Sequence, residues 1–216
     1  TASKDLLVIR AADGVPLIQM GGHQHGSGEH QDAEGTGSRP GGGETEQGNP
    51  HLWLDPVVVR DVARRVGQVL MRLDPEHADE YRHRLAAYEE QLERLDGSIR
   101  STVNRFRTKE YVAFHPAWSY FSRRYGLHEV GVIQKSPGRD PTPKQIEAVI
   151  NSIREYGIDA VFAEPQFNPA AARAIAREAG VKVLLLDPLG SPDIPGRDSY
   201  IGLMQHNLEV MREVME

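Results

Sequence analysis

The fold class is decided by residues 160–188, which read AVFAEPQFNPAAARAIAREAGVKVLLLDP. The apolar residues 160–163 predict a buried strand. Asn168-Pro169 then predicts the start of a helix, Gly180 predicts its end, and the apolar residues 181–186 predict a second strand. A strand, a helix and a strand in this order predict a right-handed crossover between two parallel strands.

The preceding segment repeats this alternation. Strands are predicted at 111–114 and 129–134, with a helix at 117–125 between them. The sequence Thr142-Pro143-Lys144-Gln145 is a capping box that opens another helix, and a last helix is predicted at about 199–214. The predicted fold class is therefore α/β, with a four-stranded parallel sheet and flanking helices in residues 108–216.

Two helices are predicted before the sheet. Asp55-Pro56 marks the start of the first, and Asp74-Pro75 marks the start of the second. Apolar residues then recur every three or four positions from Tyr81 to Phe106. This spacing predicts about 30 helical residues, roughly 45 Å in length, within residues 74–107. A helix of that length suits a stiff connection between two lobes.

Glycine and histidine are concentrated in residues 21–48. Residues 21–49 hold 10 of the 21 glycines and no Val, Leu, Ile, Met, Phe, Tyr or Trp. Such a segment cannot bury enough apolar surface to offset the entropy lost on ordering, so a disordered surface loop is predicted. Its histidines, His23, His25 and His30, lie among acidic residues and either collect zinc weakly or belong to a solvated linker.

The composition excludes several classes of protein. The 216 residues carry a net charge of −6, which is the opposite of the basic balance typical of nucleic-acid-binding proteins. The absence of cysteine excludes thiolate metal ligands and cysteine nucleophiles. No apolar run approaches the roughly 18 residues that a membrane span requires.

Three candidate ligands follow predicted strands directly. They are His115, Glu164 and Asp187, and each precedes a proline. Because the carboxyl ends of parallel strands meet at one edge of a sheet, these side chains are expected to lie close together. Imidazole and carboxylate together are ligands for a metal such as zinc. A hydrogen-bonded core histidine with helix-capping carboxylates is the structural alternative, and His51 by itself indicates an ordinary loop histidine.

The motifs of the common catalytic classes are missing. The sequence has no G-x-S-x-G, no H-E-x-x-H, no phosphate-binding loop and no G-x-G-x-x-G after a strand. No spacing pairs a serine with a histidine and an aspartate. The sequence therefore gives no support for a nucleophilic enzyme.

Five segments, in this order, resemble the metal-specific solute-binding proteins of zinc and manganese ABC transporters. They are NPHLWLDP (49–56), LDPE (73–76), FHPAWSYF (114–121), EPQF (164–167) and LDPLG (186–190). An acidic, histidine-containing loop before the first segment is typical of the zinc members. The resemblance implies that residues 1–73 are the remnant of an N-terminal lobe, 74–107 a linker helix and 108–216 a C-terminal α/β lobe.

The resemblance also implies a metal site. Its ligands would be His51, His115 and Asp187, with Glu164 as a nearby carboxylate. A histidine at position 115 favours Zn²⁺ over Mn²⁺ or Fe²⁺, which stay as the alternative within the family. The chain departs from the family at Asn49, where aspartate is usual, and it has no counterpart of the family's first histidine ligand.

The function implied is that of an extracytoplasmic binding protein. It would capture Zn²⁺ between two lobes and deliver it to an ABC permease, as a non-enzymatic monomer that is periplasmic or anchored to the outside of the membrane. Two alternatives come from other classes. One is a zinc hydrolase with three protein ligands, a water and Glu164 as base. The other is an adhesion module whose loop binds metal incidentally.

Overall fold

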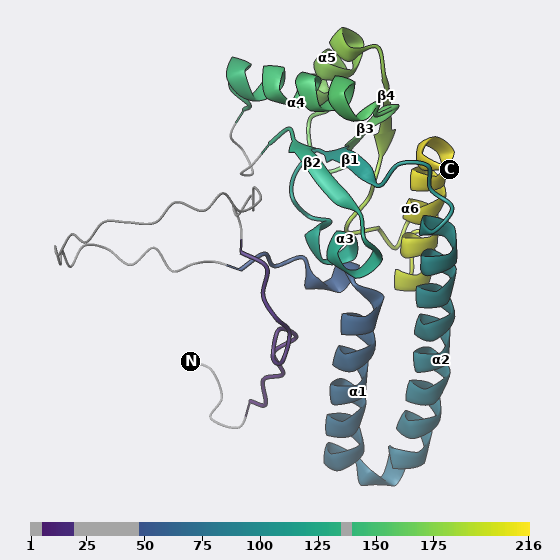
Figure 1. Ribbon diagram of the computed structural model, residues 1–216. Coiled ribbons are helices and arrows are strands. Elements are labelled where there is room, and N and C mark those ends of the chain that lie inside the picture. Colours follow the sequence, from purple (N-terminus) through teal and green to yellow (C-terminus); the bar gives the residue numbers. More distant parts are fainter. Residues whose placement is uncertain (1–5, 20–47, 135–139) are drawn as a thin grey trace, which may run out of the picture.

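The computed structural model describes residues 6–19, 48–134 and 140–216 of the chain. A region built around a sheet lies at one end of the molecule, and two long helices extend away from it (Figure 1). No helix of these residues has the length and apolar character needed to cross a membrane. Residues 20–47, with His23, His25 and His30 and all but the last residue of the predicted loop 21–48, lie outside the described residues.

The sheet has four parallel strands, as predicted. They are β1 (Glu110–Ala113), β2 (His128–Val132), β3 (Ala160–Ala163) and β4 (Lys182–Leu185), in the spatial order β2-β1-β3-β4. Three of the four strands end one or two residues earlier than predicted, and β3 has the predicted bounds. The sheet therefore places the residues after β1, β3 and β4 side by side along one edge.

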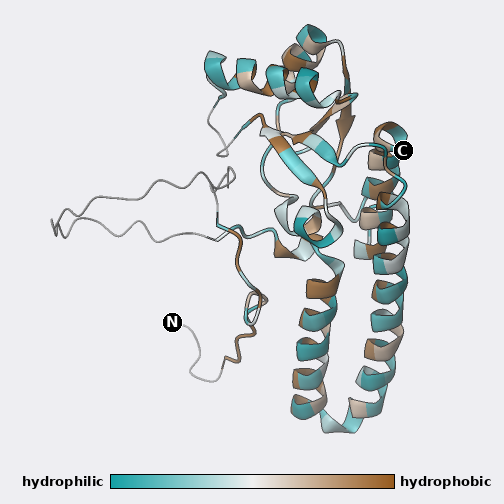
Figure 2. Ribbon diagram, viewed as in Figure 1, coloured by the Kyte–Doolittle hydropathy of each residue, from teal (hydrophilic) through white to brown (hydrophobic). Residues whose placement is uncertain are grey.

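Helices cover both faces of the sheet. One face packs on α4 (Pro143–Tyr156) and α5 (Ala170–Ala179) through Val112, Val161 and their neighbours. The other face packs on α3 (Ser119–Tyr125), α6 (Tyr200–Met215) and the end of α2 (Ala78–Val103) through Tyr111, Phe162 and their neighbours. Successive strand residues thus face opposite cores, which accounts for the continuous hydrophobicity of the buried strand β3 (Figure 2).

Local signals set the helix ends in this region. The Thr142 side chain accepts a hydrogen bond from the Gln145 backbone N–H, and the Gln145 side chain accepts one from the Thr142 backbone, as in a capping box. Gly180 ends α5 with a φ of 74°, in the left-handed region that other residues enter only with strain. These local interactions explain why the helices were predictable.

The two long helices are α1 (Pro56–Leu73) and α2, which lie side by side (Figure 1). Gly67 permits this close packing, since a Cβ at that position would lie 2.9 Å from the Leu85 Cδ2 atom. The long helix starts later than predicted, because residues 75–77 form a separate 3₁₀ turn. Asp74 does not cap a backbone N–H there; its carboxylate accepts hydrogen bonds from His77 and from the Tyr81 hydroxyl.

The residues before the loop pack on segments far along the chain. Ala12, Val15 and Ile18 contact a small core formed by Leu52, Val58 and Tyr120. The Arg65 guanidinium donates hydrogen bonds to the carbonyl groups of Arg10, Ala11 and Asp13. By contrast, Leu6 to Ile9 are exposed. The assignment of residues 1–73 to an N-terminal lobe remains a prediction.

Candidate metal site

The carboxyl edge of the sheet carries the three predicted strand-end residues. His115 follows β1 by two residues, Glu164 follows β3 directly, and Asp187 follows β4 by two residues. All three side chains are buried. The sequence prediction that they share one edge therefore agrees with the strand order.

His115 and Glu164 form a direct contact. The Glu164 Oε1 atom faces the His115 Nδ1 atom and also accepts a long hydrogen bond, 3.4 Å, from the His115 backbone N–H. A neutral His115 that donates its Nδ1 proton to this carboxylate has its lone pair on Nε2. The second oxygen of Glu164 has no hydrogen-bond partner among the described residues. Glu164 therefore orients and polarises His115 from behind.

His51 brings a second imidazole to the same point. It precedes the 3₁₀ turn Leu52–Leu54, and its Nε2 atom lies 3.2 Å from the Nε2 atom of His115. The ring centroids are 4.9 Å apart, with the planes inclined at 73°. Two histidines that are 64 positions apart in sequence thus present the same ring nitrogen to one small space.

This separation fits two ligands of a single metal ion. Two nitrogens bound to a tetrahedral zinc at about 2.05 Å each lie about 3.3 Å from one another. A neutral pair of imidazoles with both lone pairs facing inward needs a cation, or a shared proton, between them. The observed 3.2 Å separation matches a metal-binding pair, and it is also the length of an N–H···N hydrogen bond between the two rings.

Electrostatics keep His51 in the form that binds metal. Burial lowers its pKa to about 4, and the proximity of a second titratable imidazole, His115, acts in the same direction. At neutral pH His51 is consequently an uncharged imidazole with a free lone pair. Binding of a metal ion at this nitrogen does not first have to displace a proton.

Asp187 lies on the same edge of the sheet but bonds to other groups. Its Oδ1 atom accepts hydrogen bonds from Gln166 Nε2 at 2.8 Å and from the backbone N–H groups of Leu189 and Gly190. Its Oδ2 atom accepts a hydrogen bond from the Arg197 guanidinium at 3.0 Å. Burial raises the pKa of Asp187, but these donors and the Arg197 charge outweigh it, and the net pKa is lowered.

The structure therefore joins two of the three predicted ligands. No hydrogen bond links Asp187 to His51 or His115 in the described part of the chain, and residues 6–19, 48–134 and 140–216 contain no group of three His, Cys, Asp or Glu side chains placed to hold a metal. The loop histidines lie outside those residues. The assignment of Asp187 as a ligand stays a prediction, and in this structure its Oδ2 atom accepts from Arg197 instead.

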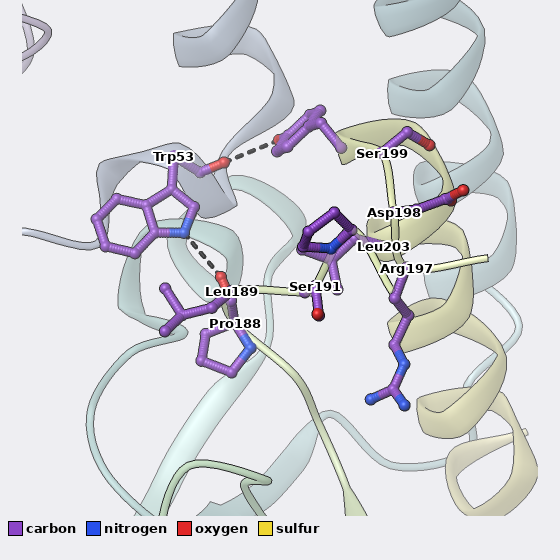
Figure 3. Close-up of a pocket in the computed structure, with 11 residues that line it drawn as sticks. Trp53, Pro188, Leu189, Ser191, Arg197, Asp198, Ser199 and Leu203 are labelled. Atoms are coloured by element: carbon purple, nitrogen blue, oxygen red, sulfur yellow. Dashed lines mark hydrogen bonds between the residues drawn. The ribbon is translucent and has the colours of Figure 1, made fainter. Parts of the chain in front are cut away.

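A cavity of about 390 Å³ adjoins this edge. Trp53, Pro188 and Arg197 are among its lining residues (Figure 3). The Trp53 indole donates a hydrogen bond to the Pro188 carbonyl at 2.9 Å, and the Tyr200 hydroxyl donates one to the Trp53 carbonyl at 2.8 Å. These bonds fasten the His51 segment to the loop after β4 and to α6.

Sequence reasoning missed Arg197 and Gln166 as partners of Asp187. Gln166 lies two residues after Glu164, and its position beyond a strand end was the only signal available. Arg197 lies in an irregular segment with no local pattern. Phe167 was also missed as a neighbour: its ring packs edge-on against His115 with centroids 5.2 Å apart.

Solved structures of similar fold identify the class of protein. A ZnuA crystal structure aligns with a TM-score of 0.77 and 27% identity, covering 96% of this chain and 70% of that one. A mutant of the laminin-binding adhesin Lmb from Streptococcus agalactiae aligns with a TM-score of 0.75 and 28% identity over the same shares. The fold is that of the solute-binding proteins of ABC transporters, as the sequence resemblance implied.

The family follows from the sequence match. The chain belongs to the family described as zinc-uptake complex component A, periplasmic (ZnuA), whose model matches residues 1–214. It is 30% identical to the high-affinity zinc uptake system protein ZnuA of Brucella abortus over 165 residues, which are 76% of this chain and 49% of that protein. It is 26% identical to the zinc-binding protein AdcA of Streptococcus pyogenes over 97% of this chain and 41% of that protein. The chain thus spans about half the length of these relatives or less.

Proposed function

We propose that this chain carries the metal-binding edge of a zinc-uptake solute-binding protein. His51 and His115 bind Zn²⁺ through their Nε2 atoms, Glu164 supports His115, and Asp187 becomes a further ligand when Arg197 releases it. The observation that carries the proposal is the pair of Nε2 atoms 3.2 Å apart. Family membership supports it independently.

The zinc preference is part of the proposal. Imidazole nitrogen suits zinc better than it suits the harder Mn²⁺ ion, which favours carboxylate and water. The curated relatives compared above are named as zinc uptake or zinc-binding proteins. Mn²⁺ or Fe²⁺ as cargo is the alternative, and the carboxylate of Asp187 is the feature that would favour it.

The proposed role is capture and delivery without chemical turnover. The bound ion would pass to an ABC permease, and the protein would act outside the cytoplasmic membrane, either free in a periplasm or anchored, as a monomer. The periplasmic description of the family supports this location. A screen of phosphatase and esterase substrates with Zn²⁺ tests the opposing hydrolase hypothesis, which requires turnover that His115→Ala abolishes.

Competition with a chelator of known zinc affinity tests the site. We expect one tight Zn²⁺ site in the chain, lost in His51→Ala and in His115→Ala and retained in His83→Ala, whose histidine is exposed on α2. Deletion of residues 21–47 should leave this site intact. The proposal fails if that deletion abolishes tight binding while the two site variants keep it, because the metal would then be held by the loop. Repeating the titration with Mn²⁺ decides between the cargo ions.

A further inference from the structure

Asn49 is a buried polar residue that contacts the segments of both site histidines. Its side-chain Nδ2 donates hydrogen bonds to the Pro116 carbonyl at 2.6 Å and to the Ser119 hydroxyl at 3.2 Å. Its Oδ1 accepts hydrogen bonds from the His51 backbone N–H at 3.0 Å and from the His51 Nδ1 at 2.7 Å. Asn49 is only 2% exposed, so these bonds have no competition from bulk water.

The chemistry of these partners determines which way the amide points. The Pro116 carbonyl can only accept, and it therefore requires the NH₂ side of the amide. The His51 backbone N–H can only donate, and it therefore requires the oxygen side. Because the Oδ1 atom has no proton, His51 must carry its own ring proton on Nδ1. The lone pair of His51 is then on Nε2, which is the nitrogen that faces His115.

We infer that Asn49 is the positioning residue of the candidate metal site: it holds His51 as the Nδ1–H tautomer and, through Pro116, ties that ring to the turn that carries His115. The expected effect of Asn49 on zinc affinity rests on the proposed function. The position of the His51 ring proton is a claim about the protein without metal, and it can be tested separately. The amide oxygen holds the His51 ring, and the amide nitrogen holds the Pro116 carbonyl. No other uncharged side chain of this size has both a donor group and an acceptor atom in these positions.

Other contacts of Asn49 show that its own position is fixed. Its backbone N–H donates to the Ile18 carbonyl at 2.6 Å, and its carbonyl accepts from the Tyr120 hydroxyl at 3.0 Å. The far side of the same segment is held separately by Trp53, as seen in Figure 3. Substitution of Asn49 should therefore change the orientation of the His51 ring without releasing the whole segment.

An aspartate at position 49 would keep one role and lose the other. A carboxylate still accepts the His51 Nδ1 proton, but it places an acceptor oxygen against the Pro116 carbonyl where the NH₂ group now lies. Two acceptors repel at that distance, so the turn carrying His115 must shift. Asn49→Asp thus alters the contacts of the amide nitrogen with Pro116 and Ser119, whereas Asn49→Ala removes both roles.

The first experiment measures ring protonation in the 216-residue chain without metal. Long-range ¹H–¹⁵N spectra, assigned with a His51→Gln variant, should show the Nδ1–H tautomer for His51 in the wild type and in Asn49→Asp, and loss of that preference in Asn49→Ala. An Nε2–H tautomer for His51 in the wild type overturns the inference. The overturning result comes from the wild type alone, so it does not depend on whether the variants at position 49 fold or on whether zinc binds.

The second experiment measures zinc affinity by chelator competition. Partners that orient a ligand histidine typically contribute 10- to 100-fold in metal affinity, so we expect a loss of about that size in Asn49→Ala and about tenfold in Asn49→Asp. The control is Asn151→Asp, which makes the same chemical change on the exposed surface of α4 and should bind zinc like the wild type. Wild-type affinity in Asn49→Asp overturns the link through Pro116. Absence of a tight site in the wild type refutes the proposed function instead, and the tautomer spectra then decide the role of Asn49 by themselves.

Discussion

Replacement of Arg197 by glutamine tests whether Asp187 becomes a metal ligand. In the structure the Arg197 guanidinium lies 3.0 Å from the Asp187 Oδ2 atom, and the two side chains are 21% and 3% exposed. A hydrogen bond between charged groups at such a site contributes about 1.5–3 kcal/mol. Arg197→Gln should lower the free energy of unfolding of the metal-free protein by about that amount, since the other donors to Asp187 remain.

The zinc affinity of Arg197→Gln should rise although the stability of the protein falls. If the metal replaces Arg197 at the Asp187 carboxylate, the wild-type protein loses the Arg197 contact on binding, and the variant has no such contact to lose. The same energy then appears as tighter binding, about 10- to 150-fold for the range above. The variant should therefore be the less stable protein without zinc and show the larger rise in melting temperature when zinc is added.

The assay is chelator competition together with thermal unfolding, with and without Zn²⁺. Arg84→Gln is the matched control, because Arg84 pairs with Glu80 on the surface of α2, where the side chains are 74% and 51% exposed. Such an i,i+4 pair contributes about 0.3–0.5 kcal/mol and should not affect zinc. The reasoning is refuted if Arg197→Gln destabilises the metal-free protein but binds zinc no more tightly, because zinc would then not compete with Arg197 for the Asp187 carboxylate.

Three further predictions concern single positions. Glu164→Gln keeps an oxygen that can accept the His115 Nδ1 proton but removes the charge, so zinc affinity should fall about 10- to 100-fold in the competition assay; an unchanged affinity would show that the charge has no role. Because the pKa of His51 is lowered from 6.5 to about 4, the unfolded chain binds more protons between those values, and the free energy of unfolding should rise from pH 4 to pH 6.5. Because this ring is half-buried and partly screened by solvent, His51 should contribute about 1–2 kcal/mol to the rise. Urea titrations from pH 4 to pH 6.5 should show that this contribution is absent in His51→Gln. Gly180→Ala forces alanine into a φ of 74° and should cost about 1–2 kcal/mol in the same titration at pH 7, whereas an unchanged midpoint would mean that the end of α5 relaxes freely.

Most of the fold was accessible from local sequence. The capping box at Thr142 and the glycine at 180 act on backbone groups within a few residues, so their effect does not depend on the rest of the molecule. The start of the long helix was misplaced for a related reason. Asp74 has the side chain of a helix cap, but His77 and Tyr81 take its carboxylate, and a 3₁₀ turn forms before α2 begins.

The candidate site was accessible only in part. Its strand-end residues were predictable, because parallel strands bring their carboxyl ends to one edge whatever their order. That rule places His115 and Glu164 together, and the structure shows them in contact. It does not say which of several donors a carboxylate at that edge will meet.

The sequence by itself therefore determined the α/β class, the strand ends that carry chemistry and, through its motifs, the family. Only the tertiary structure decided that His51 meets His115 with both Nε2 atoms facing, that Asn49 spans their two segments, and that Arg197 occupies the carboxylate of Asp187. The physical reason is range. Caps, turns and hydrophobic periodicity act between neighbours in the chain, whereas a contact between residues 64 or more positions apart forms only after packing has brought their backbones together.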